Sequence, residues 1–342
     1  MPSAADDAPE DEKHRYAVIG NPKSFWLHTT KSGFDLTQPE KPSSPQVQPR
    51  LLLQTTTTSV TISPTRSALV IIDMQNFFLS EAFGRSRGAG HDASEKLMKY
   101  AIPAARKAGI QVLWLNWGLS SEDVEDMPPA IKRAFGFEAV IDDSDGTRAE
   151  EADAFGEKPN GIGVDKHGDL KNQSGHRLLE RGKNERIYKG LGSECGEVTL
   201  PNGETVDAGR LLVRDTWNAA LYPPLNEYWQ EGKQLPKTPD VWVHKNRLSG
   251  MWGASTPCQK VLEEKGIKTL LFTGVNTDQC VSGTLTDSFS KGYDCILLND
   301  GCGTTSPDYA QLCIEFNSAK TWGFVTSCED LLKGADEMVG QP

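Results

Sequence analysis

The sequence predicts an α/β fold: a doubly wound, mainly parallel six-stranded sheet with helices on both faces. Two observations predict it. From residue 67 onward, short apolar runs alternate with helical patterns, and such alternation gives right-handed crossovers between parallel strands. The runs at residues 67–73 and 111–117 are also almost continuously apolar, as is typical of strands buried on both faces. The expected strands are residues 67–73, 111–117, 240–245, 269–275, 293–300 and 322–327.

The helices are predicted from apolar spacing and from the residues at their ends. Residues 94–108 have helical spacing, and Pro103 is expected to kink this helix or to begin a new one. A second helix has Thr256 as its N-cap, Pro257 at its first position and Gln259 completing a capping box. Three more helices are expected, at residues 278–291, after Ser306 and Pro307, and at residues 329–336.

The chain is expected to divide into an N-terminal tail and arm (1–66) and a single domain (67–336). A short strand is predicted near residues 16–20. Four prolines within residues 36–50 indicate a linker or an arm lying over the surface. Residues 51–62, rich in Leu, Thr and Val, predict a strand or hairpin before the core.

Residues 119–210 differ from the rest of the domain because they are rich in Gly, Asp and Glu and have only brief apolar runs. We expect a long excursion with little regular structure. Such excursions are usually functional or flexible, so this one is interpreted as a lid or a subunit contact. His167 and His176, within it, are expected to be solvated.

Composition excludes several classes of partner. A formal net charge of −11 argues against nucleic acid or an anionic membrane as the main partner. No stretch approaches the roughly 18 consecutive apolar residues of a membrane helix, and the polar, acidic start predicts no secretion signal. The seven cysteines are odd in number and contain no CxxC pair, which favours reduced thiols and a cytoplasmic location. The six histidines lack metal-site spacing, so no metal or cofactor is expected.

Cys280 is a candidate nucleophile because it follows a buried strand at the opening of a helix. Backbone N–H groups and the helix dipole are expected to lower its pKa there. The same N–H groups can hold the oxyanion that forms when a carbonyl is attacked. The alternative interpretation is that Cys280 is a small buried apolar side chain, as most free cysteines are.

Two more polar residues end predicted strands. Asp73 follows four apolar residues, so partial desolvation should raise its pKa and make it a possible proton acceptor. Lys245 ends the run VWVHK and can stabilise both a thiolate and a carboxylate. Each residue alone has a simpler explanation: Asp73 as an aspartate that caps a loop, and Lys245 as a solvated surface lysine. Ligands bind at the carboxyl ends of parallel strands, where all three residues are expected to meet.

The segments SALVIIDMQNFF, VWVHKNRLSGMWG and TGVNTDQCVSG resemble the isochorismatase-like cysteine hydrolase superfamily, and most closely its ureidoacrylate amidohydrolase-type branch. The resemblance implies that Asp73, Lys245 and Cys280 form a catalytic triad. It also implies a cis peptide bond between Val275 and Asn276, with the N–H groups of Asn276 and Cys280 as the oxyanion hole. The metal-binding DxH motif of the nicotinamidase branch has no counterpart in this sequence.

The function implied is hydrolysis of a C–N bond in a small amide or ureide, through a thioester on the cysteine, releasing ammonia or an amine. Isochorismatase-type vinyl ether hydrolysis and a non-catalytic binding role are the alternatives. Members of the superfamily commonly assemble as dimers or tetramers, so a homo-oligomer is expected. The candidate substrate-binding residues, each of which can instead serve in core packing or at the surface, are Gln75, Asn116, Trp117, Arg247 and Trp252.

Overall fold

A six-stranded, all-parallel sheet forms the centre of the protein in this computed structural model, which describes residues 13–139, 162–169, 180–181, 185–186 and 189–339. The strand order is β14-β7-β6-β15-β16-β17. The predicted doubly wound α/β fold is therefore confirmed. The strands are β6 (Ser67–Ile72), β7 (Gln111–Trp117), β14 (Val241–Lys245), β15 (Thr269–Val275), β16 (Asp294–Gly303) and β17 (Phe324–Thr326).

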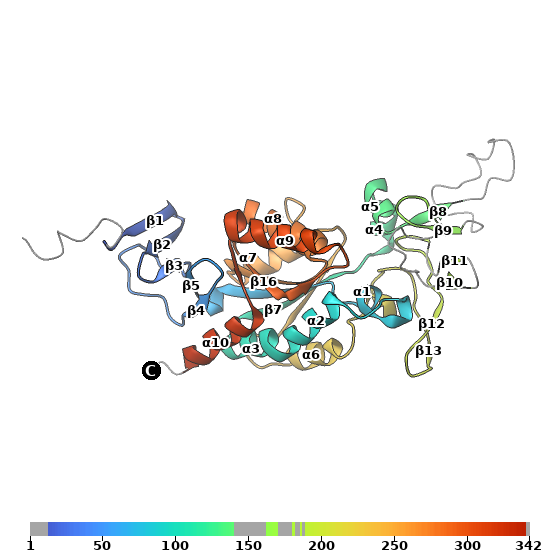
Figure 1. The fold of residues 1–342 in the computed structure, drawn as a ribbon, viewed down its shortest axis with the longest axis horizontal. Helices are drawn as coiled ribbons and strands as arrows, with labels where there is room; N and C mark the ends of the chain where they lie inside the picture. The colour runs from blue at the N-terminus through green and yellow to red at the C-terminus, as the bar shows by residue number, and fades with distance from the viewer. Residues whose placement is uncertain (1–12, 140–161, 170–179, 182–184, 187–188, 340–342) are drawn as a thin grey trace, which may run out of the picture.

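Helices cover both faces of this sheet (Figure 1). One face carries α2 (Ala89–Lys96), α3 (Ile102–Ala108), α6 (Leu225–Gly232) and α10 (Cys328–Val339). The other carries α7 (Pro257–Glu264), α8 (Ser282–Ser290) and α9 (Asp308–Asn317). Successive strand residues point to opposite faces, so Ile71 and Trp114 pack with the first group while Ile72 and Leu115 pack with the second.

The helix predicted at residues 94–108 begins earlier and contains a π turn. α2 runs into η3 (Leu97–Ala101) and then into α3, with Pro103 in the first turn of α3. Proline has no N–H to donate to the preceding turn, which is the usual reason for such a local irregularity. Gly109, at φ 78°, ends the helix in the left-handed conformation that glycine adopts without strain.

One capping prediction is wrong in part. Thr256 is the N-cap of α7, and its hydroxyl accepts from the Gln259 N–H at 3.2 Å. The Gln259 side chain does not return to the cap. It instead donates to Glu263 and accepts from Lys291, because a charged partner on each side competes successfully for its amide.

Helix α9 presents its apolar residues to solvent. Tyr309, Leu312 and Phe316 are 73%, 61% and 66% exposed. Ile314, on another side of the helix, packs against the core. Helical spacing correctly predicted the helix, but it does not distinguish a core face from an exposed one.

The N-terminal arm forms a second sheet of five strands, in the order β1-β2-β3-β5-β4. The strands are β1 (Tyr16–Asn21), β2 (Ser24–Thr29), β3 (Gly33–Asp35), β4 (Leu51–Gln54) and β5 (Ser59–Ile62). The predicted hairpin at residues 51–62 is β4–β5. Leu53 and Ile62 are fully buried in the same core as Leu69 and Ile71 of β6, so the predicted domain boundary after residue 66 crosses a shared hydrophobic core.

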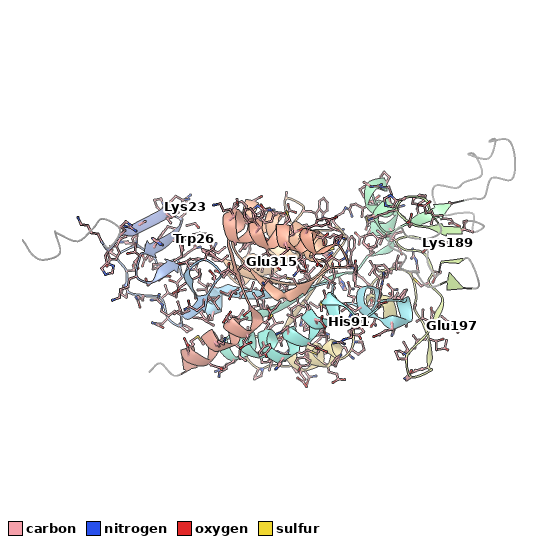
Figure 2. All side chains as sticks on the ribbon, viewed as in Figure 1. Lys23, Trp26, His91, Lys189, Glu197 and Glu315 are labelled. Atoms are coloured by element: carbon pink, nitrogen blue, oxygen red, sulfur yellow. The ribbon has the colours of Figure 1, made fainter. Side chains whose placement is uncertain are left out.

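A buried carboxylate joins the two sheets. Asp294, at the start of β16, accepts hydrogen bonds from Trp26 Nε1 at 2.7 Å, Gln38 Nε2 at 3.1 Å and Thr269 Oγ1 at 3.2 Å. Figure 2 shows Trp26 where the N-terminal sheet meets the central domain. Burial raises the pKa of Asp294 to about 6, although these hydrogen bonds lower it.

Substituting Asp294 by Asn should therefore change how stability depends on pH. The folded protein binds this proton more tightly than the unfolded chain, whose aspartate has a pKa of about 3.9. The unfolding free energy of the native protein should fall, relative to Asp294→Asn, by roughly 2–3 kcal/mol as pH rises from about 4 to about 6. Urea denaturation across this range measures it, with the exposed Asp92→Asn as control. A difference that does not vary with pH would refute the assignment.

The excursion at 119–210 contains only short elements within its described residues. They are α4 (Ser121–Glu125), α5 (Pro129–Ala134), β8 (Phe137–Ala139), β9 (Ile162–Val164), β10 (Glu180–Arg181), β11 (Glu185–Arg186), β12 (Glu197–Thr199) and β13 (Thr205–Asp207). Leu119, Leu191 and Val198 are nevertheless buried against the α7–α8 side of the core. His167 is exposed, as expected, and His176 lies outside the described residues. No described helix is long and apolar enough to cross a membrane.

Candidate active site

Three polar side chains from separate segments meet at the carboxyl end of the sheet. Asp73 follows β6, Lys245 ends β14, and Cys280 lies in η6 (Thr277–Val281), directly after β15. Lys245 Nζ is 2.9 Å from Asp73 Oδ2 and 3.5 Å from Cys280 Sγ. The three residues are 0%, 4% and 3% exposed. The structure thus brings the predicted catalytic residues into direct contact.

Asp73 reaches this group through an unusual backbone conformation. Strict alternation after Leu69 and Ile71 would direct its side chain to the α3–α10 face. At φ 53° the chain instead turns at Asp73, and the carboxylate accepts from the Trp117 N–H at 3.0 Å. A non-glycine residue in this region costs about 1–3 kcal/mol and is found mainly where the surrounding structure enforces it.

The Lys245 ammonium is held on several sides. Besides Asp73 and Cys280, it donates to the Arg247 carbonyl at 3.2 Å. It also lies 4.1 Å from the centre of the Trp117 ring, a cation–π contact. A buried charge is stable only when paired and hydrogen-bonded, and these partners meet that requirement.

The pKa of Cys280 is raised, not lowered as predicted. Burial raises it to about 12, and although the Lys245 charge lowers it, the Asp73 charge opposes that effect. Cys280 is the fourth residue of its turn and fully enclosed, so loss of hydration outweighs the helix dipole. The resting residue is therefore a neutral thiol at neutral pH.

The pKa of Asp73 is raised, as predicted. Burial is the main cause, opposed by the Lys245 charge and by hydrogen bonds from Lys245, Cys280 and the Trp117 backbone. A carboxylate that contacts the thiol and has an elevated proton affinity is a chemically suitable acceptor for its proton.

The loop before the cysteine has the expected backbone geometry. The Val275–Asn276 peptide bond is cis, which confirms that prediction. The Asn276 carbonyl accepts from the N–H groups of Gln279 and Val281 and so fixes the turn around Cys280. The assignment of the Asn276 and Cys280 N–H groups as an oxyanion hole stays a prediction.

Two of the predicted substrate-binding side chains point elsewhere. Gln75 is fully buried, and its amide spans the backbone of Trp117 and Ala219, with hydrogen bonds of 2.6–3.1 Å. Gln75 therefore holds the backbone of these two segments together. Asn116 alternates with Trp117 on β7 and lies in register with His244, so strand geometry places it on the face opposite Lys245. The sequence correctly predicted that Asn116 lies near the carboxyl end of β7, but it did not predict which face of the sheet the side chain occupies.

The other three predicted residues lie near the triad. Trp117 is fully buried against Lys245. Arg247 stacks on Trp252, with its guanidinium carbon 4.9 Å from the ring centre, and donates to the Asn246 carbonyl. Trp252 is 54% exposed. Their roles in binding a substrate stay predictions.

Two residues of the excursion that the sequence analysis did not single out contribute to the surroundings of the site. Phe135, at the end of α5, packs edge-on against Trp117 with ring centres 5.1 Å apart. Asn246, the residue directly after Lys245, donates a hydrogen bond from Nδ2 to Asp123 of α4 at 2.7 Å. The only sequence signal was the short apolar run around Phe135, which lies in an otherwise polar stretch.

Asp123→Ala should loosen this contact between the excursion and the segment that follows β14. Burial raises the pKa of Asp123, but hydrogen bonds from Asn246 and Ser120 outweigh it and leave the pKa lowered. The stabilisation should therefore be present at neutral pH and be lost as pH falls below about 4. At pH 7 we expect a loss of about 1–2 kcal/mol in unfolding free energy. Chemical denaturation measures it, with exposed Glu122→Ala as control; equal effects of the two variants would contradict the role.

The sequence of this chain is similar to known hydrolase sequences. A family model described as the isochorismatase domain matches residues 199–329, which include Lys245 and Cys280. The chain is 26% identical over 277 residues to ureidoacrylate amidohydrolase RutB of Enterobacter sp. (strain 638), covering 80% of this chain and 90% of that protein.

Solved structures to which the chain is similar include a cysteine hydrolase from Pseudomonas syringae pv. phaseolicola 1448A, with a TM-score of 0.48, 18% identity and coverage of 86% of this chain and 99% of that one. Nicotinamidase PncA from Bacillus subtilis has a TM-score of 0.46, 15% identity and coverage of 77% and 99%. The chain thus contains a region similar to the isochorismatase domain, and the domain match and the curated relative together support a hydrolase.

Proposed function

We propose that the protein is a cysteine amidohydrolase that cleaves a C–N bond of a small amide or ureide. The observation that carries the proposal is the buried contact of one ammonium, Lys245, with both the Asp73 carboxylate and the Cys280 sulfur. A thiol, a proton acceptor and a fixed cation are the groups that acyl transfer through a thioester requires. The similarity to a ureidoacrylate amidohydrolase supports this substrate class.

In the proposed first half-reaction, Asp73 accepts the proton of the Cys280 thiol as the sulfur attacks the substrate carbonyl carbon. The N–H groups of Asn276 and Cys280 stabilise the oxyanion that forms. When the C–N bond breaks, Asp73 returns the proton to the departing nitrogen, so ammonia or an amine leaves neutral. The product bound to the enzyme is a thioester on Cys280.

In the second half-reaction, water attacks the thioester carbon while Asp73 accepts a proton from it. The C–S bond then breaks, the acid product leaves, and the proton returns to the Cys280 sulfur. Lys245 remains charged throughout. Because the thiol has a raised pKa, proton transfer to Asp73 has to accompany attack, which makes the position of Asp73 beside the thiol essential.

Ammonia release from a panel of small amides and ureides tests the proposal. The panel includes ureidoacrylate, biuret and nicotinamide, with isochorismate as a vinyl ether outside the amide class. Turnover of one or more amides or ureides is expected. If no amide or ureide of the panel releases ammonia and isochorismate is cleaved, the activity is vinyl ether hydrolysis and the proposal is wrong.

A homo-oligomeric state, dimer or tetramer, and a cytoplasmic location are part of the same proposal. The exposed stripe of Tyr309, Leu312 and Phe316 on α9 supports self-association, since large apolar patches on soluble proteins usually mark contacts. Light scattering of the full chain measures the mass, and a Leu312→Glu variant should dissociate an assembly that uses this stripe. The odd number of cysteines supports the location.

A further inference from the structure

A cavity of about 470 Å³ lies beside the edge strand β14, on the side where α6 packs. Figure 1 shows α6 on the same side of the sheet as α2 and α3. Cavities of roughly 300–1,000 Å³ lined by aromatic groups and a few polar ones are the usual sites for small molecules. The side chains used below are Trp229 and Gln230 of α6, Trp242 and His244 of β14, and Arg214 and Asp215 of the connecting segment.

This cavity is separate from the triad because β14 divides them. Val243 packs into the core on the α7–α8 side, where Lys245 contacts Cys280. Because side chains alternate along β14, Trp242 points away from the side of Val243 and Lys245 and packs on the opposite side of the sheet. His244 follows Trp242 onto that side and lines the cavity. A ligand there would not contact the Cys280 sulfur.

The aromatic wall is held in place by contacts among its own members. The Trp229 and Trp242 ring centres are 5.3 Å apart at 61°, and those of Trp242 and His244 are 5.9 Å apart at 65°. Trp242 Nε1 donates to His244 Nδ1 at 3.3 Å. The imidazole pKa is lowered by burial and then by the Arg214 charge. His244 is therefore neutral, with its proton on Nε2 as a donor.

The polar groups of the wall balance one another in charge. Arg214 supplies a cation, whose guanidinium also lies 3.8 Å from Asp123 outside the lining. Asp215 supplies an anion, while Gln230 offers both an amide donor and a carbonyl acceptor. With His244 neutral, the named charges of the lining sum to zero. Such a wall does not favour an anion or a cation, but it does suit a neutral molecule that carries both donors and acceptors. The tryptophans suit a planar one, because flat π systems stack on their faces.

We propose that this cavity is a second binding site, for a neutral planar nitrogen heterocycle of nucleobase size. Ring stacking on Trp229 and Trp242 supplies affinity, and hydrogen bonds to His244 Nε2, Asp215 and Gln230 select a ring with both donors and acceptors. The site does not depend on the proposed amidase activity, since it shares none of the triad side chains.

Isothermal titration of the full chain with adenine and cytosine tests the proposal, with indole and benzoate as the apolar and anionic comparisons. Saturable binding of a nucleobase, tighter than that of indole and benzoate, is expected. Trp229→Ala removes a stacking face and should weaken binding at least about tenfold. Ala220→Trp should also weaken binding, because the new side chain fills the cavity from an exposed position of its wall. This variant leaves the contacts of Trp229 and Trp242 unchanged, so it tests binding without disturbing their packing. Exposed Glu227→Ala, also on α6, and Cys280→Ala should bind as the native protein does.

Three results would overturn the proposal. One is no saturable binding of either nucleobase. Another is indole or benzoate binding as tightly as the nucleobases, which would remove the selectivity argued from the polar groups. The last is binding that Ala220→Trp leaves unchanged while alkylation of Cys280 abolishes it, because that would place the ligand at the triad.

Discussion

Cys280→Ala is expected to lower the rate of ammonia release by about 10³-fold or more, because the variant has no atom that can form the thioester. The side chain is almost fully buried and loses only its sulfur, so the fold should remain. Steady-state ammonia release on the best substrate of the panel measures the effect. Circular dichroism establishes that the variant is folded.

Other cysteines provide matched controls. Cys258 is as buried as Cys280 but packs in α7, and Cys313 is exposed on α9. Alanine at either position should leave the rate within about threefold of the native enzyme, since neither contacts the triad. An equal loss in Cys258→Ala would indicate that packing, not nucleophilicity, explains the effect. Retained ammonia release in Cys280→Ala would show that the cysteine is dispensable.

Lys245→Met is expected to have the second largest effect, on both stability and rate. It removes the cation 2.9 Å from Asp73 and leaves a fully buried carboxylate unpaired. Loss of one partner of a buried ion pair costs about 3–5 kcal/mol. The pKa of Asp73, already raised by burial, should rise further because Lys245 lowers it in the native protein. The destabilisation should therefore shrink as pH is lowered, since a protonated Asp73 carries no charge.

A double-mutant cycle with Asp73→Asn separates pairing from packing. Asp73→Asn/Lys245→Met has neither charge and should recover most of the stability lost in Lys245→Met, when measured by urea denaturation at pH 7. Additive losses in the double variant would mean that the two residues are not coupled. The two variants that contain Asp73→Asn should lack amidase activity, because Asp73 is the proposed proton acceptor. Lys245→Met should also be strongly impaired, because it removes the cation that contacts both Asp73 and Cys280.

The strands and the meeting of Asp73, Lys245 and Cys280 were predictable because the signals are local. Each core strand is an apolar run, and the ends of parallel strands necessarily share one edge of the sheet. The direction of individual side chains was less accessible. Asp73 joins the triad only because its positive φ breaks strand alternation, whereas Asn116 obeys alternation and points away.

Other features depend on contacts between distant segments. The pKa of Cys280 follows from complete burial, which a helix-start pattern does not reveal. The N-terminal sheet pairs β3 with β5 in parallel, across the proline-rich segment between them. Phe135 reaches Trp117 from an excursion whose composition indicates only irregular structure. Each depends on tertiary packing, to which local propensity gives little guidance.

Mass spectrometry of the enzyme, quenched in acid during the first turnover of its best amide or ureide, tests the central claim most directly. The account predicts a transient increase on the peptide containing Cys280, equal to the mass of the substrate acyl group, appearing with the first ammonia and decaying as the acid product forms. Ammonia and acid that accumulate while this peptide keeps its unmodified mass at every time point would contradict a cysteine nucleophile.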